Sequence, residues 1–260
     1  MIKQNRSLVR GLRILRAFNE VPQPSLAEIA AAVELDKTTC RRFLLTLQEE
    51  GYVEFDDTLK RYQLRPLVLE LGYARLNSLS VPKLAAPYMR ELANQVGGAV
   101  NLSILDGDEI VLVGRTVADV EKRKLVTMNL HVGMRLPAHC TAMGRILIGT
   151  THDDLRSFVA AMKVHKLASS TVVNRTALTQ AIAEAVRKGY AVVADQLSLG
   201  YGAIAVSLGT GMTERFGLAV SITTSDYSPE RLEQDVLPEL RAVKDKLDRV
   251  LAMRAGGNHS

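Results

Sequence analysis

The chain contains few cysteines and no long run of apolar residues. Its 260 residues include two cysteines, Cys40 and Cys140, and their wide separation argues against a framework of stabilising disulfides. No stretch approaches the roughly 18 unbroken apolar residues that a membrane span requires. The first six residues do not form the apolar part of a secretion signal. We therefore expect reduced thiols and a cytoplasmic location.

Acidic residues are missing from the start of the chain. The basic residues that precede Glu20, the first acidic one, are Lys3, Arg6, Arg10, Arg13 and Arg16. This asymmetry is typical of an arm and helix that face DNA phosphates, although a solvated helix face explains the run equally well. The net charge of +5 does not by itself identify a nucleic-acid-binding protein.

The sequence also lacks a constellation suited to catalysis or metal binding. His139 and Cys140 are adjacent, so neither a strand nor a helix turns both side chains to one site. Adding His131 gives an irregular spacing for a metal, and residues 209–211 lack the Lys-Ser/Thr ending of a phosphate-binding loop. We therefore expect that the protein is not an enzyme and that it binds neither a metal nor a cofactor. A small-molecule enzyme or a signalling module that does not bind DNA stays as the alternative.

The first 65 residues carry the signals of three helices. An apolar stripe predicts that the first helix buries Leu8, Leu12, Leu15 and Phe18. Ser25 and Glu28 have the spacing of a capping box and begin a second helix, and Asp36 is a suitable N-cap for a third.

The third helix combines an apolar face with a basic N-terminal half. Its predicted buried residues are Cys40, Phe43, Leu44 and Leu47. A recognition helix contacts DNA from its N-terminal part, where arginine pairs with guanine and threonine contacts phosphate or a thymine methyl. The following alternation of Val53 and Phe55 with Tyr62 and Leu64 predicts a hairpin with a basic tip.

This order of elements is the plan of a winged helix-turn-helix over residues 1–65. A protein-interaction use of the same small fold is the rival interpretation. The predicted DNA-binding residues are Arg6, Ser25, Lys37, Thr38, Thr39, Arg41, Arg42, Lys60 and Arg61.

Residues 66–80 predict a linker helix that is apolar on more than one face, as Leu67, Leu71 and Leu79 indicate. Such a helix needs a partner, and packing against a second copy would align two recognition helices with successive half-sites. Residues 81–255 predict an α+β domain on an antiparallel sheet. Its expected strands are 99–105, 110–113, 125–132, 190–193, 204–208 and 218–222, and its expected helices are 82–96, 141–148, 153–162, 176–188 and 228–253.

Several stretches resemble the IclR family of transcription regulators, and the similarity covers nearly the whole chain. They are residues 25–30, 36–44, 50–53, 133–145, 189–193, 198–200 and 204–206. The run Gly-Met-Arg-Leu-Pro-Ala-His-Cys-Thr-Ala-Met-Gly-Arg at 133–145 most resembles the branch that controls catabolism of aromatic acids such as protocatechuate and 4-hydroxybenzoate.

The resemblance implies a GAF-like effector-binding domain, a dimer or dimer of dimers, and repression or activation set by a small organic acid. The pocket residues that it implies are Leu136, His139, Thr141, Met143, Leu147, Asp195, Tyr201, Ala203, Ser221 and Thr223. The acid at Asp195 and the run 201–203 depart from the usual family pattern, so the identity of the effector stays open.

An acid effector needs donors inside an apolar cleft, because an unpaired buried charge is costly. Arg135, His139, Thr141 and the amides near Thr141 are the candidates. A surface salt bridge explains Arg135 equally well, and core packing is the alternative for Met143 and Leu147.

Overall fold

The computed structural model describes residues 4–119, 128–209, 214–225 and 227–257. They belong to two compact units, Met1–Ser78 and Leu79–Ser260. Each unit has its own arrangement of helices and strands.

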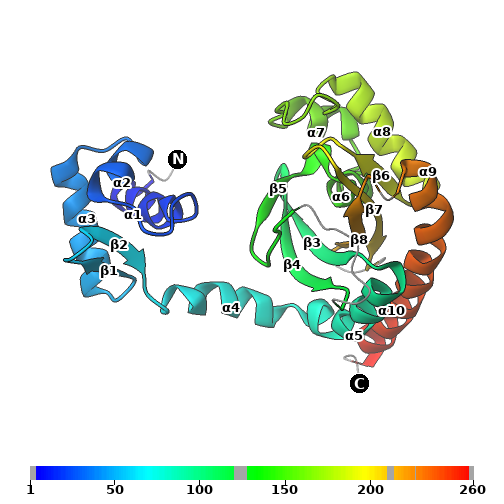
Figure 1. Cartoon of the computed structure of the whole chain (residues 1–260), viewed down its shortest axis with the longest axis horizontal. Helices are drawn as coiled ribbons and strands as arrows, with labels where there is room; N and C mark the ends of the chain where they lie inside the picture. The colour runs from blue at the N-terminus through cyan, green and yellow to red at the C-terminus, as the bar shows by residue number, and fades with distance from the viewer. Residues whose placement is uncertain (1–3, 120–127, 210–213, 226, 258–260) are drawn as a thin grey trace. The chain divides into compact units, whose positions relative to one another are not determined.

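The first unit packs three helices on a two-stranded hairpin. α1 (Arg6–Ala17), α2 (Leu26–Ala32) and α3 (Lys37–Glu49) precede β1 (Val53–Asp56), β2 (Arg61–Leu64) and α4 (Val68–Ser78) (Figure 1). β1 and β2 pair antiparallel, with Phe55 opposite Tyr62. The core contains Ile14, Phe18, Ile29, Ala30, Val33, Cys40, Leu44, Val53 and Tyr62. This arrangement confirms the winged helix-turn-helix that the sequence predicts.

Local signals set the ends of the helices in this unit. Ser25 and Glu28 form the predicted capping box, in which each side chain accepts the other residue's backbone N–H. Asp36 caps α3 by accepting the N–H of Thr39 at 2.8 Å. Gly51, at φ +79°, takes the left-handed conformation just past the end of α3.

The predicted buried stripe of α1 is wrong in its first half. Leu8 and Leu12 are 62% and 48% exposed, whereas Ile14 is fully buried and Phe18 is nearly so. The core of this unit contacts the last turns of α1, so the apolar residues of the earlier turns have no core to enter.

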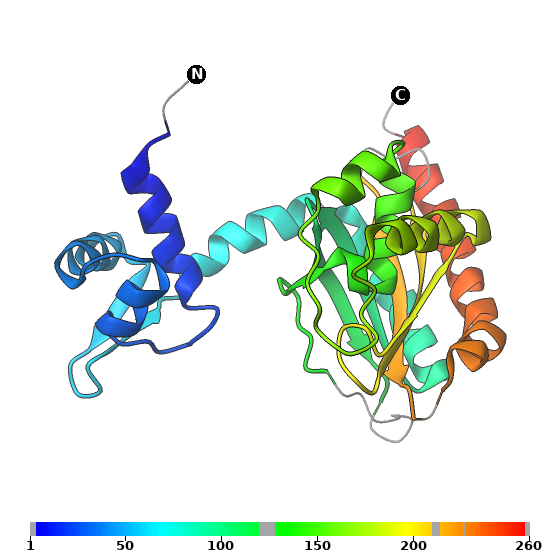
Figure 2. The same cartoon turned by 90° about the horizontal axis from the view of Figure 1, so that it is seen from above.

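The second unit has helices on both faces of one antiparallel sheet. The strand order is β5 (Arg135–Pro137), β4 (Glu109–Val117), β3 (Ala99–Asp106), β8 (Phe216–Thr223), β7 (Tyr201–Leu208) and β6 (Ala191–Ala194). One face carries α5 (Ser80–Val96) and α10 (Leu237–Gly257), and the other carries α6 (Ala142–Thr151) and α8 (Arg175–Lys188), with α7 (Leu155–Ala161) beside α8 (Figures 1 and 2). The predicted α+β fold is confirmed.

The predicted strand at 125–132 is wrong over residues 128–132. Its first part, up to residue 127, lies outside the described residues, and residues 128–132 form no strand. The pairing with β4 is made instead by a turn at Gly133, whose N–H bonds to the carbonyl of Leu112, and then by β5. Gly133 has φ +89°, which a regular strand does not accommodate.

The predicted closing helix, 228–253, is divided in the structure. A short helix α9 (Pro229–Arg231) leads into a π-helical turn, Leu232–Val236, before α10 begins. Pro238 has no N–H to donate to the preceding turn, which accounts for irregular helical hydrogen bonding at this point.

Candidate nucleic-acid interface and ligand site

The N-terminal half of α3 presents a basic surface. Lys37, Thr38, Arg41 and Arg42 are exposed and Thr39 is partly so. Cys40 and Leu44 lie on the buried face of α3, so the face that carries the basic residues points to solvent. Lys37, Arg41 and Arg42 have no acidic partner within the described ranges. Their positive charge is therefore available to an anionic partner.

The arginines of α1 extend this basic surface. Arg6, Arg10, Arg13 and Arg16 are exposed and form no ion pair with any residue that the structure describes. Arg10 and Arg42 border the same groove of about 400 Å³ between α1 and α3, together with Thr39. Two helices thus contribute positive charge to one shallow feature of the first unit.

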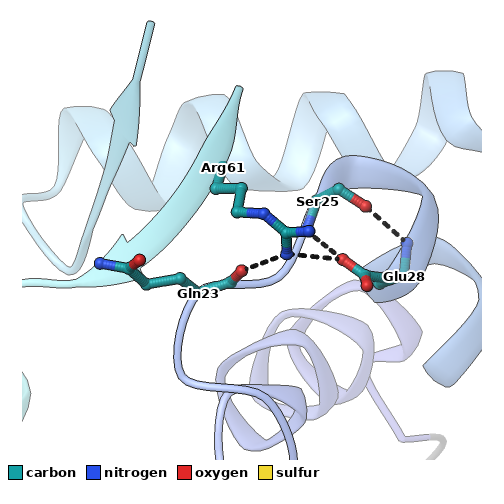
Figure 3. A network of polar contacts seen from close by, with 4 residues as sticks. All are labelled: Gln23, Ser25, Glu28 and Arg61. Atoms are coloured by element: carbon teal, nitrogen blue, oxygen red, sulfur yellow. Dashed lines mark hydrogen bonds and ion pairs between the residues drawn. The ribbon is translucent and has the colours of Figure 1, made fainter. Parts of the chain in front are cut away.

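The hairpin tip and its neighbouring strand have different roles in the structure. Lys60 lies at the tip, where its side chain is 72% exposed and pairs only loosely with Asp57 at 3.3 Å. Arg61 instead donates to the carbonyl of Gln23 at 2.7 Å and to Glu28 at 3.1 Å (Figure 3). Arg61 therefore ties the hairpin to the start of α2, and its charge is shared with a carboxylate.

Glu28 connects this ion pair with the capping box. The same oxygen, Oε2, accepts from Arg61 and from the N–H of Ser25, the latter at 2.7 Å (Figure 3). Hydrogen bonds from Ser25 and, next, the charge of Arg61 lower the pKa of Glu28. The polar atoms of Ser25 are thus engaged at the start of α2. The ion pair of Glu28 with Arg61 also holds the hairpin in place.

In the second unit the structure brings together the predicted residues of β7 and β8. Ala203 pairs with Ser221 and Tyr201 with Thr223, and paired residues of an antiparallel ladder share a face of the sheet. Met143 and Leu147 of α6 pack in the same core cluster as Tyr201 and Ala203. The α6 face of the sheet is therefore where these residues meet.

A chain of polar contacts crosses this face from β4 to β7. Arg115 donates to Asn101 Oδ1 at 2.8 Å, Asn101 Nδ2 donates to Ser221 Oγ at 3.0 Å, and Ser221 Oγ lies 2.7 Å from the hydroxyl of Tyr201. Burial raises the pKa of Tyr201, so its hydroxyl keeps its proton. Asn101 and Arg115 are not among the site residues predicted from the sequence. The signal was present in Asn101 and Ser103, polar residues at alternate positions of an otherwise apolar strand.

Arg135 and Asp195 do not join this group. Arg135 is exposed on β5 and bonds to Asp106 at 2.8 Å and Glu109 at 2.7 Å, as the salt-bridge alternative anticipates. Asp195, at φ +57°, accepts the N–H of Gly200 at 2.7 Å and so fixes the turn before β7.

The segment before α6 is buried and polar. His139 is fully buried, with Nε2 3.0 Å from the carbonyl of His165, and Nδ1 has no partner among the described residues. Burial lowers the pKa of His139, which favours the neutral ring. Thr141 caps α6 through Gly144 N at 3.1 Å, and Leu136 is buried in the same core cluster.

The other titratable residues of this segment do not suggest catalysis. Burial raises the pKa of the Cys140 thiol to about 11, which keeps it protonated and poorly nucleophilic. Arg145, also buried, bonds to the carbonyl of His139 at 2.9 Å and to Gln196 at 2.5 Å. Within the described ranges, no cluster of His, Cys, Asp and Glu has the geometry to hold a metal.

None of the described helices is long and apolar enough to span a bilayer.

Comparison with known proteins identifies the family. The model "IclR helix-turn-helix domain" matches residues 7–57, and "Bacterial transcriptional regulator IclR C-terminal" matches residues 73–249. The chain belongs to the IclR family. The predicted IclR resemblance is thereby confirmed over both units.

Individual IclR relatives agree with this assignment. The chain is 34% identical over 244 residues to the Pca regulon regulatory protein of Pseudomonas putida, covering 93% of this chain and 82% of that protein. It is 26% identical to the p-hydroxybenzoate hydroxylase transcriptional activator of Acinetobacter baylyi, covering 92% and 89%. A putative transcriptional regulator from Rhodococcus sp. RHA1, solved by crystallography, is 34% identical with a TM-score of 0.78, covering 96% and 99%.

These IclR proteins are regulators of transcription. The predictions of a DNA-binding transcription regulator, and of a regulator rather than an enzyme, are therefore confirmed. The similarity to the aromatic-acid branch is supported by the two named relatives.

Proposed function

We propose that this IclR-family protein reads its operator with the N-terminal half of α3. The observation that carries the proposal is the exposed and unneutralised charge of Lys37, Arg41 and Arg42 on a helix whose other face is locked in the core. Arginines placed in this way pair with guanine in the major groove, and Thr38 and Thr39 contact bases or phosphate beside them.

The remaining DNA-binding residues divide by role. Arg6 on α1 and Lys60 at the hairpin tip contact the sugar-phosphate backbone, since both are exposed and basic. Ser25 and Arg61 act indirectly, because their polar atoms hold α2 and the hairpin together. We assign these two residues to positioning rather than to direct contact.

The effector of the proposed regulator is a hydroxylated aromatic acid. The supporting features are the buried polar and apolar residues of the α6 face and the similarity to regulators named for the Pca regulon and for p-hydroxybenzoate hydroxylase. The proposed pocket takes in Tyr201, Ala203, Ser221 and Thr223, with Met143, Leu147, Leu136, His139 and Thr141 around it. Arg135 and Asp195 are engaged in other contacts and are left outside it.

The proposed regulator works as a dimer or a dimer of dimers. α4 has no buried residue, and Leu69, Leu71 and Tyr73 are 69%, 61% and 63% exposed. These side chains lie on more than one face of α4, so packing against other copies of the chain would cover them and pair two recognition helices. The effector then changes operator affinity only as far as it binds the two states of the dimer differently.

Fluorescence anisotropy tests the proposal directly. The full chain is titrated against labelled upstream DNA and a scrambled duplex at fixed salt, with and without 4-hydroxybenzoate, protocatechuate and benzoate. We expect tighter binding to the upstream DNA and a change of that affinity with one of the acids. Equal affinity for both duplexes would contradict DNA reading, and an unchanged operator affinity with every acid would contradict the effector class.

A further inference from the structure

The polar contacts on the α6 face leave one hydroxyl proton without an acceptor among the described residues. Asn101 Oδ1 faces Arg115, so its amide group Nδ2 must be the donor to Ser221 Oγ. The hydroxyls of Ser221 and Tyr201 then share a single hydrogen bond. Two hydroxyls carry two protons, and one bond between them uses only one of these.

The second hydroxyl proton has no acceptor among the residues that the structure describes. Ser221 is fully buried and Tyr201 is 5% exposed, and within the described ranges their hydroxyls make only the hydrogen bonds just given. An unused donor in such a place costs free energy unless a bound group accepts from it. The neighbouring hydroxyl of Ser103 is already directed to the sulfur of Met143 at 3.2 Å.

Arg115 supplies an unneutralised charge at the same place. Its guanidinium contacts Asn101 and, at 3.5 Å, the carbonyl of Met128, but no carboxylate within the described part of the chain. Partial burial lowers its pKa, and its charge acts on Tyr201. A half-buried guanidinium keeps three of its five N–H groups for another acceptor.

A third feature points to a bound polar molecule. Thr223, which pairs with Tyr201 across the ladder, is 7% exposed, and its Oγ1 has no partner among the described residues. The side chains that separate these polar groups are small, as Ala203 and Ala219 show, and the α6 residues above are apolar. Polar groups among small and apolar side chains suit a ligand with an apolar body and polar ends.

We infer that the carboxylate of the acid effector binds between the guanidinium of Arg115 and the hydroxyl pair Tyr201–Ser221. Asn101 orients both sides, since it accepts from Arg115 and donates to Ser221. One carboxylate oxygen accepts the surplus hydroxyl proton, and the guanidinium neutralises the charge. The inference rests on the proposed aromatic-acid effector and assigns its carboxylate to Arg115, in place of Arg135.

Calorimetric titration of the full chain with 4-hydroxybenzoate and with its uncharged isostere 4-hydroxybenzamide tests the inference. We expect the unsubstituted protein to bind the acid at least about 30-fold more tightly than the amide. Arg115→Met should abolish this preference, and Tyr201→Phe should weaken acid binding about 10-fold or more. The matched control Arg135→Met removes the same charge from the adjacent strand and should keep the preference.

The outcomes of these titrations separate failure of the inference from failure of the proposed effector class. Equal binding of acid and amide by the unsubstituted protein overturns the inference, and this comparison needs no variant to fold. An acid preference retained by Arg115→Met, or lost in Arg135→Met, also overturns it while the proposed effector class stands. If none of the three acids binds while operator binding is specific, the effector class fails and the inference with it. Operator binding without effector shows that each variant is folded.

Discussion

Neighbouring residues of α3 occupy opposite environments. Cys40 and Leu44 are fully buried, while Arg41 lies exposed between them. The buried residues fix how α3 is rotated about its own axis. This rotation decides that Arg41 points to solvent. The contribution of each arginine to DNA binding can therefore be measured without disturbing the core.

Replacing Arg41 or Arg42 by alanine should weaken operator binding by about 1 to 3 kcal/mol each if the side chain reads a base. Binding to a scrambled duplex should fall less, because base contacts are specific to sequence. Anisotropy titrations on both duplexes measure the difference. Gln48→Ala, at the exposed C-terminal end of α3, is the control and should leave both affinities unchanged. Equal losses on the two duplexes would show that the arginines touch only phosphate.

Lys60 and Arg61 are adjacent and should respond differently. Lys60→Ala should weaken binding to all sequences and reduce the salt slope of the binding constant by about 1, as expected for one lost phosphate contact. Arg61→Ala should leave the salt slope unchanged and lower the melting temperature, since its guanidinium holds Gln23 and Glu28. A reduced salt slope for Arg61→Ala would instead place Arg61 on the phosphates.

At the scale of the elements, short-range signals predicted most helix ends. The capping box at Ser25 and the stop at Gly189, with φ +77°, depend on residues within a few positions, so the sequence contains them whole. The misplaced strand at 125–132 and the role of Arg115 depend on pairing across the sheet. Such pairing is a property of the fold, and no local pattern encodes it.

The start of α2 should give stability a dependence on pH. Hydrogen bonds from Ser25 lower the pKa of Glu28 below its usual 4.5, so the charged form is the one that the fold stabilises. This stabilisation is present above the unfolded pKa and is lost as the pH falls through the folded one. The melting temperature of Glu28→Gln should therefore lie below that of the unsubstituted protein at neutral pH, and the gap should close below about pH 4. A gap of constant size between these conditions would contradict the assignment.

α6 begins in close contact with the segment before it. A methyl group at Gly144 would collide with the backbone of Ala138, so Gly144→Ala should destabilise the second unit by about 1 to 3 kcal/mol and reduce effector binding. Gly11→Ala is the matched control, because α1 leaves open space there and alanine favours a helix by about 0.5 to 1 kcal/mol. Calorimetric unfolding compares the two. Equal changes of the unfolding free energy in the two variants would show that the close approach of Gly144 to Ala138 does not destabilise Gly144→Ala.

At the scale of the whole molecule, α4 is a helix whose large apolar side chains one chain alone leaves exposed. Leu69→Asp and Leu71→Asp should shift the protein toward a monomer, because a charge on the proposed interface would be buried without a partner. Sedimentation velocity measures the assembly state, and operator titrations should show weaker binding since only one half-site is held. Glu70→Ala, on the same exposed helix, should change neither quantity. An unchanged sedimentation coefficient for both leucine variants would exclude α4 from the interface.

The separation of buried and exposed residues on α3 also bears on how such regulators diverge. A substitution at Thr38 or Arg41 alters the surface that we propose reads DNA and leaves Cys40 and Leu44 in place. A duplicated gene can therefore acquire a new target site by single substitutions, without first acquiring others that restore the fold. Selection on the target site and selection on foldability act on different residues of the same helix, so each can proceed without opposing the other.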